Sequence, residues 1–166
     1  MEEVTVAKKV LLVGNFGVGK TSLISRYVLN EFSEKYISSI GVRISTKVVA
    51  CEKKVIKLLI WDVAGTIGNE KIPKSYFLGA SAAMFVFDLS RADTYLSAKA
   101  DVASIKEMSG LQNFIIVGNK TDLINTNELE KIRTLVGMNI DFETSAKDGL
   151  NVEEAFKILA KRSINS

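Results

Sequence analysis

The sequence predicts an α/β fold in which a mostly parallel sheet carries helices on both faces. Apolar runs rich in branched residues alternate with stretches of helical period, and short connections join them. No linker or internal repeat divides the chain. Alternation of this kind is typical of parallel sheets built from strand–helix units. Because 166 residues is the size of one domain, we expect residues 1–166 to form a single domain.

The first half of the chain predicts three strands and one helix. Residues 9–14 (KVLLVG) are expected to form a buried strand, and residues 20–29 (KTSLISRYVL) a helix whose apolar residues share one face. Residues 42–51 and 54–63 are expected to be the next two strands. Since only two residues separate them, the pair is predicted to form an antiparallel hairpin.

The second half predicts the centre and the far edge of the sheet. Residues 82–89 and 114–120 are almost entirely apolar, which is typical of central strands covered on both faces. Residues 141–145 are expected to form a short last strand. Helices are expected near residues 70–78, 93–108 and 127–136 and, with Asn151 as the N-cap, over residues 151–162.

The composition excludes several classes of function. The chain has no histidine, which excludes histidine triads, histidine bases and histidine metal sites. Its single cysteine, Cys51, excludes an internal disulfide and suits a reducing compartment. The net charge of +3, from 22 basic and 19 acidic residues, is too balanced to indicate nucleic acid as a main partner. No targeting segment, transmembrane segment or cysteine for lipidation is visible, so a cytoplasmic protein is expected.

Residues 14–21 (GNFGVGKT) predict a phosphate-binding loop. They fit the pattern G-x-x-x-x-G-K-[ST] between a strand and a helix, the context that this pattern requires. The glycines let main-chain N–H groups face an anion, and the start of the helix adds its positive dipole end. Lys20 is predicted to place its charge on the outer phosphates, and the Thr21 hydroxyl to bind Mg²⁺. A glycine-rich turn that binds nothing would leave both side chains without a role. The residues predicted to contact phosphate here are Gly14, Asn15, Phe16, Gly17, Val18, Gly19, Lys20, Thr21 and Ser22.

Asp62 ends the third predicted strand and is a candidate metal ligand. A carboxylate at this position reaches an ion beside Thr21, directly or through water, and the N–H of Gly65 can meet the terminal phosphate. The pattern D-x-x-G is weak evidence alone, because aspartate commonly caps turns. With a phosphate loop on the neighbouring strand, it predicts a magnesium site.

Residues 118–123 (GNKTDL) predict recognition of guanine. Asp122 can accept two N–H bonds from the Watson–Crick edge of guanine, whereas adenine would leave the carboxylate unsatisfied. Asn119 and the aliphatic part of Lys120 are expected to brace the loop and cover the ring. A polar surface turn is the alternative for these residues taken alone.

The segment ETSAK, residues 143–147, is expected to complete the base site. The N–H of Ala146 is predicted to meet the guanine oxygen, with Lys147 stacked opposite Lys120. In open α/β sheets, ligands bind at the carboxyl ends of the strands. The chemically suggestive residues all follow predicted strands, namely Gly14, Asp62, Asn119 and Ser145.

Together these residues resemble a Ras-superfamily small GTPase. Within that superfamily, the sequences of the motifs are most similar to the Rab-like branch. The segments YISSIGV (36–42), WDVAG (61–65) and SYFLGA (75–80) carry the resemblance beside the two base-site motifs. It implies the P-loop NTPase G domain, with a six-stranded sheet that has one antiparallel edge strand. It also implies GTP and GDP as ligands with Mg²⁺, and a role in signalling or vesicle trafficking.

The resemblance further implies two switch segments, residues 32–42 and 65–78, that present a nucleotide-dependent surface to effector and regulatory proteins. By position, Phe32 resembles the aromatic residue beside the base, and Tyr36 the switch tyrosine. Ser39 stands where the family places a threonine that binds Mg²⁺, and serine keeps the hydroxyl. The implied metal ligands are therefore Thr21, Ser39 and Asp62. Membrane recruitment is expected only through partners or through a lipidated tail that this sequence lacks.

Two residues depart from the family pattern at the reacting phosphate. The implied catalytic positions are Lys20, Gly65 and Thr66, and Thr66 replaces the glutamine that orients the attacking water. Loss of that amide is expected to slow hydrolysis about ten- to a hundredfold, or about 1.4–2.7 kcal/mol of barrier. Phe16 replaces a glycine or small residue, and it either crowds the γ-phosphate or turns outward over Ile67. Both arrangements predict a poor response to an arginine-finger activator.

The sequence is compatible with three functions. The first is a guanine-nucleotide switch, formally a GTPase, that hydrolyses GTP slowly. The second is a scaffold that holds its nucleotide almost permanently. The third is a P-loop enzyme that uses ATP, which Asp122 and the ETSAK segment argue against.

Overall fold

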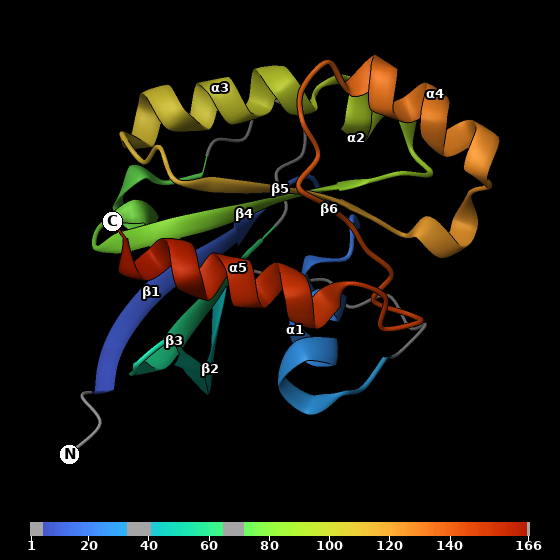
Figure 1. Cartoon of the computed structure of the whole chain (residues 1–166). Coiled ribbons are helices and arrows are strands. Elements are labelled where there is room, and N and C mark those ends of the chain that lie inside the picture. Colours follow the sequence, from blue (N-terminus) through green and yellow to red (C-terminus); the bar gives the residue numbers. More distant parts are fainter. Residues whose placement is uncertain (1–4, 33–40, 65–71, 166) are drawn as a thin grey trace.

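The computed structural model describes residues 5–32, 41–64 and 72–165. Its strands form one sheet in the order β2-β3-β1-β4-β5-β6 (Figure 1). The strands are β1 (Thr5–Val13), β2 (Val42–Cys51), β3 (Lys54–Val63), β4 (Ala80–Asp88), β5 (Phe114–Asn119) and β6 (Phe142–Glu143). The helices are α1 (Lys20–Leu29), α2 (Ala92–Leu96), α3 (Ala98–Ser109), α4 (Thr126–Val136) and α5 (Val152–Ile164), with short 3₁₀ turns η1 (Lys74–Phe77) and η2 (Thr121–Leu123).

The sheet has the predicted six strands with one antiparallel edge strand. β2 pairs antiparallel with β3, whereas the pairs β1–β3, β1–β4, β4–β5 and β5–β6 are all parallel. The bounds of α1, β2 and β3 agree with the predicted ranges. Glu52 turns the hairpin with a φ of 58°, a left-handed conformation that suits a tight reversal.

The helix predicted over residues 93–108 is wrong in one respect, because Ser97 divides it into α2 and α3. The Ser97 hydroxyl donates to the main-chain oxygen of Asp93 at 2.9 Å and to Asp101 Oδ2 at 2.8 Å. Serine side chains compete with the helix in this way for main-chain partners. Of the predicted helix over 70–78, the described part forms only the turn η1, and residues 70 and 71 lie outside the described residues.

Asn151 is the N-cap residue of α5, as predicted, but its φ is 58° and its side chain makes no capping hydrogen bond. Its amide donates instead to the main-chain oxygen of Glu143 at 2.9 Å. The side chain therefore ties the start of α5 to β6.

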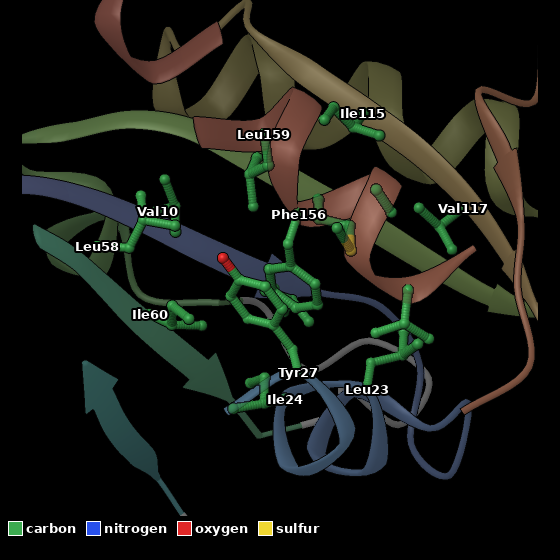
Figure 2. Close-up of a cluster of buried hydrophobic side chains, with 14 of the residues drawn as sticks. Val10, Leu23, Ile24, Tyr27, Leu58, Ile60, Ile115, Val117, Phe156 and Leu159 are labelled. Atoms are coloured by element: carbon green, nitrogen blue, oxygen red, sulfur yellow. The ribbon is translucent and has the colours of Figure 1, made fainter. Parts of the chain in front are cut away.

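Helices α1 and α5 cover one face of the sheet, and α2, α3 and α4 cover the other (Figure 1). Strands β4 and β5 are almost entirely buried, as expected for the centre of such a sheet. On the α1–α5 face, the ring of Tyr27 stacks on that of Phe156, with centroids 4.1 Å apart and planes 2° from parallel (Figure 2). This contact fixes α1 against α5. Among the described residues, no helix is long and apolar enough to cross a membrane.

Candidate nucleotide-binding site

The loop between β1 and α1 is shaped by glycines that admit no side chain. Gly14 has a φ of 149°, and a Cβ there would collide with the main-chain oxygen of Val86. Gly19 has a φ of 102°, and a Cβ there would collide with the side-chain amide of Asn119. A substitution at Gly14 would force β4 away from the loop, and one at Gly19 would displace the side chain of Asn119. The predicted phosphate loop is therefore packed directly against the two central strands.

Lys20 lies at the start of α1 and curls back over this loop. Its ammonium donates to the main-chain oxygens of Gly14 and Asn15, each at 2.9 Å. The side chain is only 6% exposed, and burial lowers the pKa of Lys20 to about 8, while the charge of Asp62 opposes this shift. Among the described residues, the hydrogen bonds of this ammonium go to neutral carbonyls, and a buried cation so placed favours an anion beside it.

Asp62 and Thr21 meet at the ends of neighbouring elements, as predicted for a metal site. The Thr21 hydroxyl donates to Asp62 Oδ2 at 2.6 Å. Asp62 is 2% exposed, and burial raises its pKa, against the opposing effects of Thr21, Lys20 and Arg43. Within the described residues, Asp62 Oδ1 has no hydrogen-bond partner.

This donor set fits Mg²⁺. A buried carboxylate oxygen without a partner is costly unless a cation or donor completes it. The described residues contain no group of three or more acidic, histidine or cysteine side chains that could hold a metal ion. Two protein oxygens are typical of Mg²⁺ sites that take their remaining ligands from phosphate and water.

Asn119 joins three segments that are far apart in the sequence. Its side-chain amide donates to the main-chain oxygen of Val18 at 3.1 Å. Its Oδ1 accepts from the hydroxyl of Thr144 at 2.9 Å and from the N–H of Ala146 at 3.3 Å. Asn119 is 1% exposed, so this network is shielded from water. The contact between Ala146 N–H and a guanine oxygen stays a prediction, because this N–H faces Asn119 here.

Lys120 also connects the base side to the phosphate loop. Its ammonium donates to the main-chain oxygen of Gly17 at 2.8 Å. It also lies 2.8 Å from Asp88 Oδ2, and since the angles fall outside hydrogen-bonding geometry, this contact is an ion pair. Asp88 was not predicted as a site residue, although it ends an apolar strand just as Asp62 lies near the end of another. Its carboxylate draws Lys120 toward the loop, which leaves the aliphatic part of that side chain as the expected cover for a base.

Asp122 lies in η2 and is exposed. Its Oδ1 accepts from the buried Ser145 hydroxyl at 2.8 Å. Ser145 Oγ in turn accepts from the N–H of Asp148 at 3.0 Å. Ser145 therefore orients the carboxylate that is predicted to read guanine, a role that its type and position alone do not reveal.

Comparison with known proteins identifies the family. The model of the Ras family matches residues 9–165. The chain belongs to the Ras family.

The relatives of this Ras-family protein include Rab proteins. It is 36% identical over 162 residues to the Ras-related protein Rab-11A of Dictyostelium discoideum, covering 94% of this chain and 75% of that one. It is 38% identical over 165 residues to the Ras-related protein Rab-25 of Bos taurus, covering 96% and 78% respectively. It is 36% identical over 160 residues to the GTP-binding protein ypt1 of Schizosaccharomyces pombe, covering 93% and 78%. The Ras-family protein is therefore Rab-like, as predicted.

Two further predicted residues can be placed in this Ras-family protein. Phe16 is half-buried, and its main-chain oxygen accepts from Arg91 Nη1 at 2.8 Å. Arg91 precedes α2, and no sequence pattern indicates this contact. Phe32 packs against the hydrophobic cluster beneath α1 and α5. Four predicted residues, Tyr36, Ser39, Gly65 and Thr66, lie outside the described residues together with Ile67.

Proposed function

We propose that this protein is a molecular switch that binds GTP and GDP with Mg²⁺ and hydrolyses GTP slowly. Membership of the Ras family makes it a GTP-binding protein and a GTPase in general class. The observation that carries the finer proposal is the Asn119 network, which holds the phosphate loop and residues 144 and 146 in one unit. Such a unit suits a ligand with phosphates at one end and a base at the other.

Each end of this site has a defined chemical task. The Lys20 ammonium and the N-terminus of α1 bind the phosphates, and Thr21 and Asp62 would hold the metal. When it is bound, Mg²⁺ would neutralise part of the negative charge of the phosphates. Asp122, oriented by Ser145, accepts the two N–H groups of guanine and leaves adenine unfavourable.

Slow hydrolysis is proposed because Thr66 is too short to orient the attacking water as glutamine does. Phosphoryl transfer depends on positioning, so this loss is expected to slow the unaided reaction about ten- to a hundredfold. A protein that keeps its GTP for hours, with no partner able to accelerate its loss, is the second candidate. Thr66 and Phe16 favour it over a rapid switch.

Presentation of a surface to partner proteins is supported by the apolar side chains beside the predicted switch segments. Ile44 of β2 is 53% exposed and pairs across the sheet with Trp61 of β3. The Trp61 ring lies 6.4 Å from that of Tyr76, within the predicted second switch. Ile44 is exposed and the two rings are half-buried, and apolar groups that gather in this way at a surface favour protein partners.

The decisive experiment identifies the nucleotide that is released from the purified protein and then follows a single turnover of GTP with Mg²⁺. We expect guanine nucleotide in stoichiometric amount and slow formation of GDP. Equal retention of ATP, or of no nucleotide, would contradict the proposal. Hydrolysis at zero rate with and without cell-derived activators would favour the scaffold.

A further inference from the structure

The segment between β6 and α5, residues 144–148, is here called the base-side loop. Its inward side is held by the side chains of Asn119 and Asp122. Its outward side consists of main-chain oxygens that need partners of their own. Arg26 supplies them, because its Nε donates to Ala146 O at 2.8 Å and its Nη2 to Lys147 O at 2.6 Å.

Arg26 itself is fixed from several directions. It belongs to α1, the helix that Lys20 and Thr21 begin. Its third nitrogen, Nη1, donates to Asn30 Oδ1 at 3.3 Å. Its Cδ lies beside Gly149, where an added Cβ would stand 3.8 Å away. All three guanidinium nitrogens therefore have acceptors, and the side chain is half-buried between α1 and the base-side loop.

A planar guanidinium is well suited to bridge two successive carbonyls, since its donors are fixed in a fork. Charged donors also make stronger hydrogen bonds than neutral ones. The same loop presents the Ala146 N–H and the Ser145 hydroxyl that orients Asp122. Movement of the loop would therefore also move the groups that are expected to contact guanine.

We propose that Arg26 is a positioning residue that determines how long guanine nucleotide stays bound, by holding the base-side loop against α1. This inference rests on the proposed guanine-nucleotide function. It assigns Arg26 to the base end of the site, because its bonds reach Ala146 and Lys147 and not Thr21 or Asp62. Nucleotide release governed by Arg26 is therefore independent of the metal.

The test compares Arg26→Ala and Arg26→Lys with the control Arg133→Ala. Arg133 also makes two hydrogen bonds near β6, to Glu143 at 2.6 and 2.7 Å, but none to the base-side loop. Each protein is loaded with fluorescent GDP, and release is followed in excess unlabelled GDP, with Mg²⁺ or with EDTA. Arg26→Ala loses both charge-assisted hydrogen bonds to the base-side loop, so we expect it to release GDP at least about tenfold faster than wild type.

Comparison of the GDP release rates in Mg²⁺ and in EDTA distinguishes an effect at the base end from a general loosening of the whole site. The acceleration in Arg26→Ala should be the same factor in Mg²⁺ and in EDTA, and Arg133→Ala should release GDP as wild type does. Arg26→Lys keeps the charge but reaches only one carbonyl, so its rate should lie between wild type and Arg26→Ala. If Arg26→Ala does not fold, Arg26→Lys alone tests the proposal.

Three results overturn the inference. They are release from both Arg26 variants at the wild-type rate, acceleration only when Mg²⁺ is present, and equal acceleration in Arg133→Ala. Wild-type protein that retains no guanine nucleotide would instead overturn the proposed function on which the inference rests.

Discussion

Side chains that bond to main-chain oxygens hold the candidate site together at the scale of single residues. Lys20 donates to two carbonyls of the phosphate loop and Lys120 to a third, and Asn119 donates to a fourth. These contacts hold the loop in a curled form, which is expected to turn main-chain N–H groups toward an anion. Preorganised donors of this kind do not need to reorient when phosphate arrives.

Removal of the Ser145 hydroxyl should weaken guanine binding. In Ser145→Ala, Asp122 loses its orienting hydrogen bond and the Asp148 N–H loses its acceptor. We expect affinity for GDP to fall about fivefold, as for the net loss of one hydrogen bond of about 1 kcal/mol. Titration with fluorescent GDP measures this. Ser109→Ala is the control, since its hydroxyl bonds to Ile105 O at 2.6 Å in α3, and an equal loss there would contradict the assignment.

The binding of GDP should depend on the charge of Lys20. The pKa of Lys20 in the free protein is lowered to about 8 by burial, whereas bound phosphates favour the charged form and raise it. Affinity should therefore be full below that pKa and fall by up to about tenfold per pH unit as pH rises above it. Fluorescent GDP titrations at increasing pH test this. Lys20→Arg stays charged, so identical profiles for the two proteins would contradict the prediction.

Hydrolysis should recover when the two departures from the family pattern are reversed. The double variant Thr66→Gln with Phe16→Gly gains an amide to orient water and loses the phenyl group of the phosphate loop. We expect single-turnover hydrolysis to rise about ten- to a hundredfold. Thr66→Ala serves as the control and should hydrolyse GTP no faster than wild type. An unchanged rate in the double variant would mean that another element is missing.

At the scale of helices and strands, α1 has three tasks that no other element shares. Its first residues contribute to the phosphate and metal ends of the site, its middle carries Arg26 to the base-side loop, and its inner face packs on α5 through Tyr27 and Phe156. The helix therefore connects the core to both ends of the site.

Loss of the ring stack between α1 and α5 should destabilise the whole domain. Phe156 is 1% exposed, and Phe156→Ala would remove its ring from the centre of the cluster in Figure 2. We expect the free energy of unfolding to fall by about 3–5 kcal/mol. Chemical denaturation followed by the fluorescence of Trp61 measures it. Leu123→Ala, at a side chain that is 58% exposed, should stay within about 0.5 kcal/mol of wild type.

At the scale of the whole molecule, the order of the strands in the sheet determines which residues meet at the site. Because β1 lies between β3 and β4, the phosphate loop stands beside Asp62 on one side and near Asn119 on the other. The ligand would thus connect both halves of the sheet. Whatever binds there should stabilise the domain as a single cooperative unit.

Guanine nucleotide should therefore raise global stability. GDP at about 1,000 times its dissociation constant should add about 4 kcal/mol to the free energy of unfolding. Chemical denaturation with and without GDP and Mg²⁺ measures this, and ADP at the same concentration should add little. Asn119→Ala should lose most of the gain. Equal stabilisation by ADP would contradict selection of guanine.

The strands and α1 could be predicted because their signals are local. The apolar runs and the Lys20 start of α1 lie in the segments that they define, so the bounds of α1, β2 and β3 agree with the structure. The break at Ser97 was missed because it depends on one hydroxyl taking the main-chain oxygen of Asp93. Asn151 was assigned a capping bond by type, but the proximity of Glu143 redirects its amide.

The sequence by itself determined which chemistry the chain carries, because Lys20, Thr21, Asp62 and Asp122 follow strands in recognisable local patterns. The tertiary structure alone decided what holds them in place. Asn119 meets Val18 across 101 positions of sequence, and Arg26 meets Ala146 across 120. Hydrogen bonds over such separations have no local signature, because they exist only once the strand order has brought the partners together.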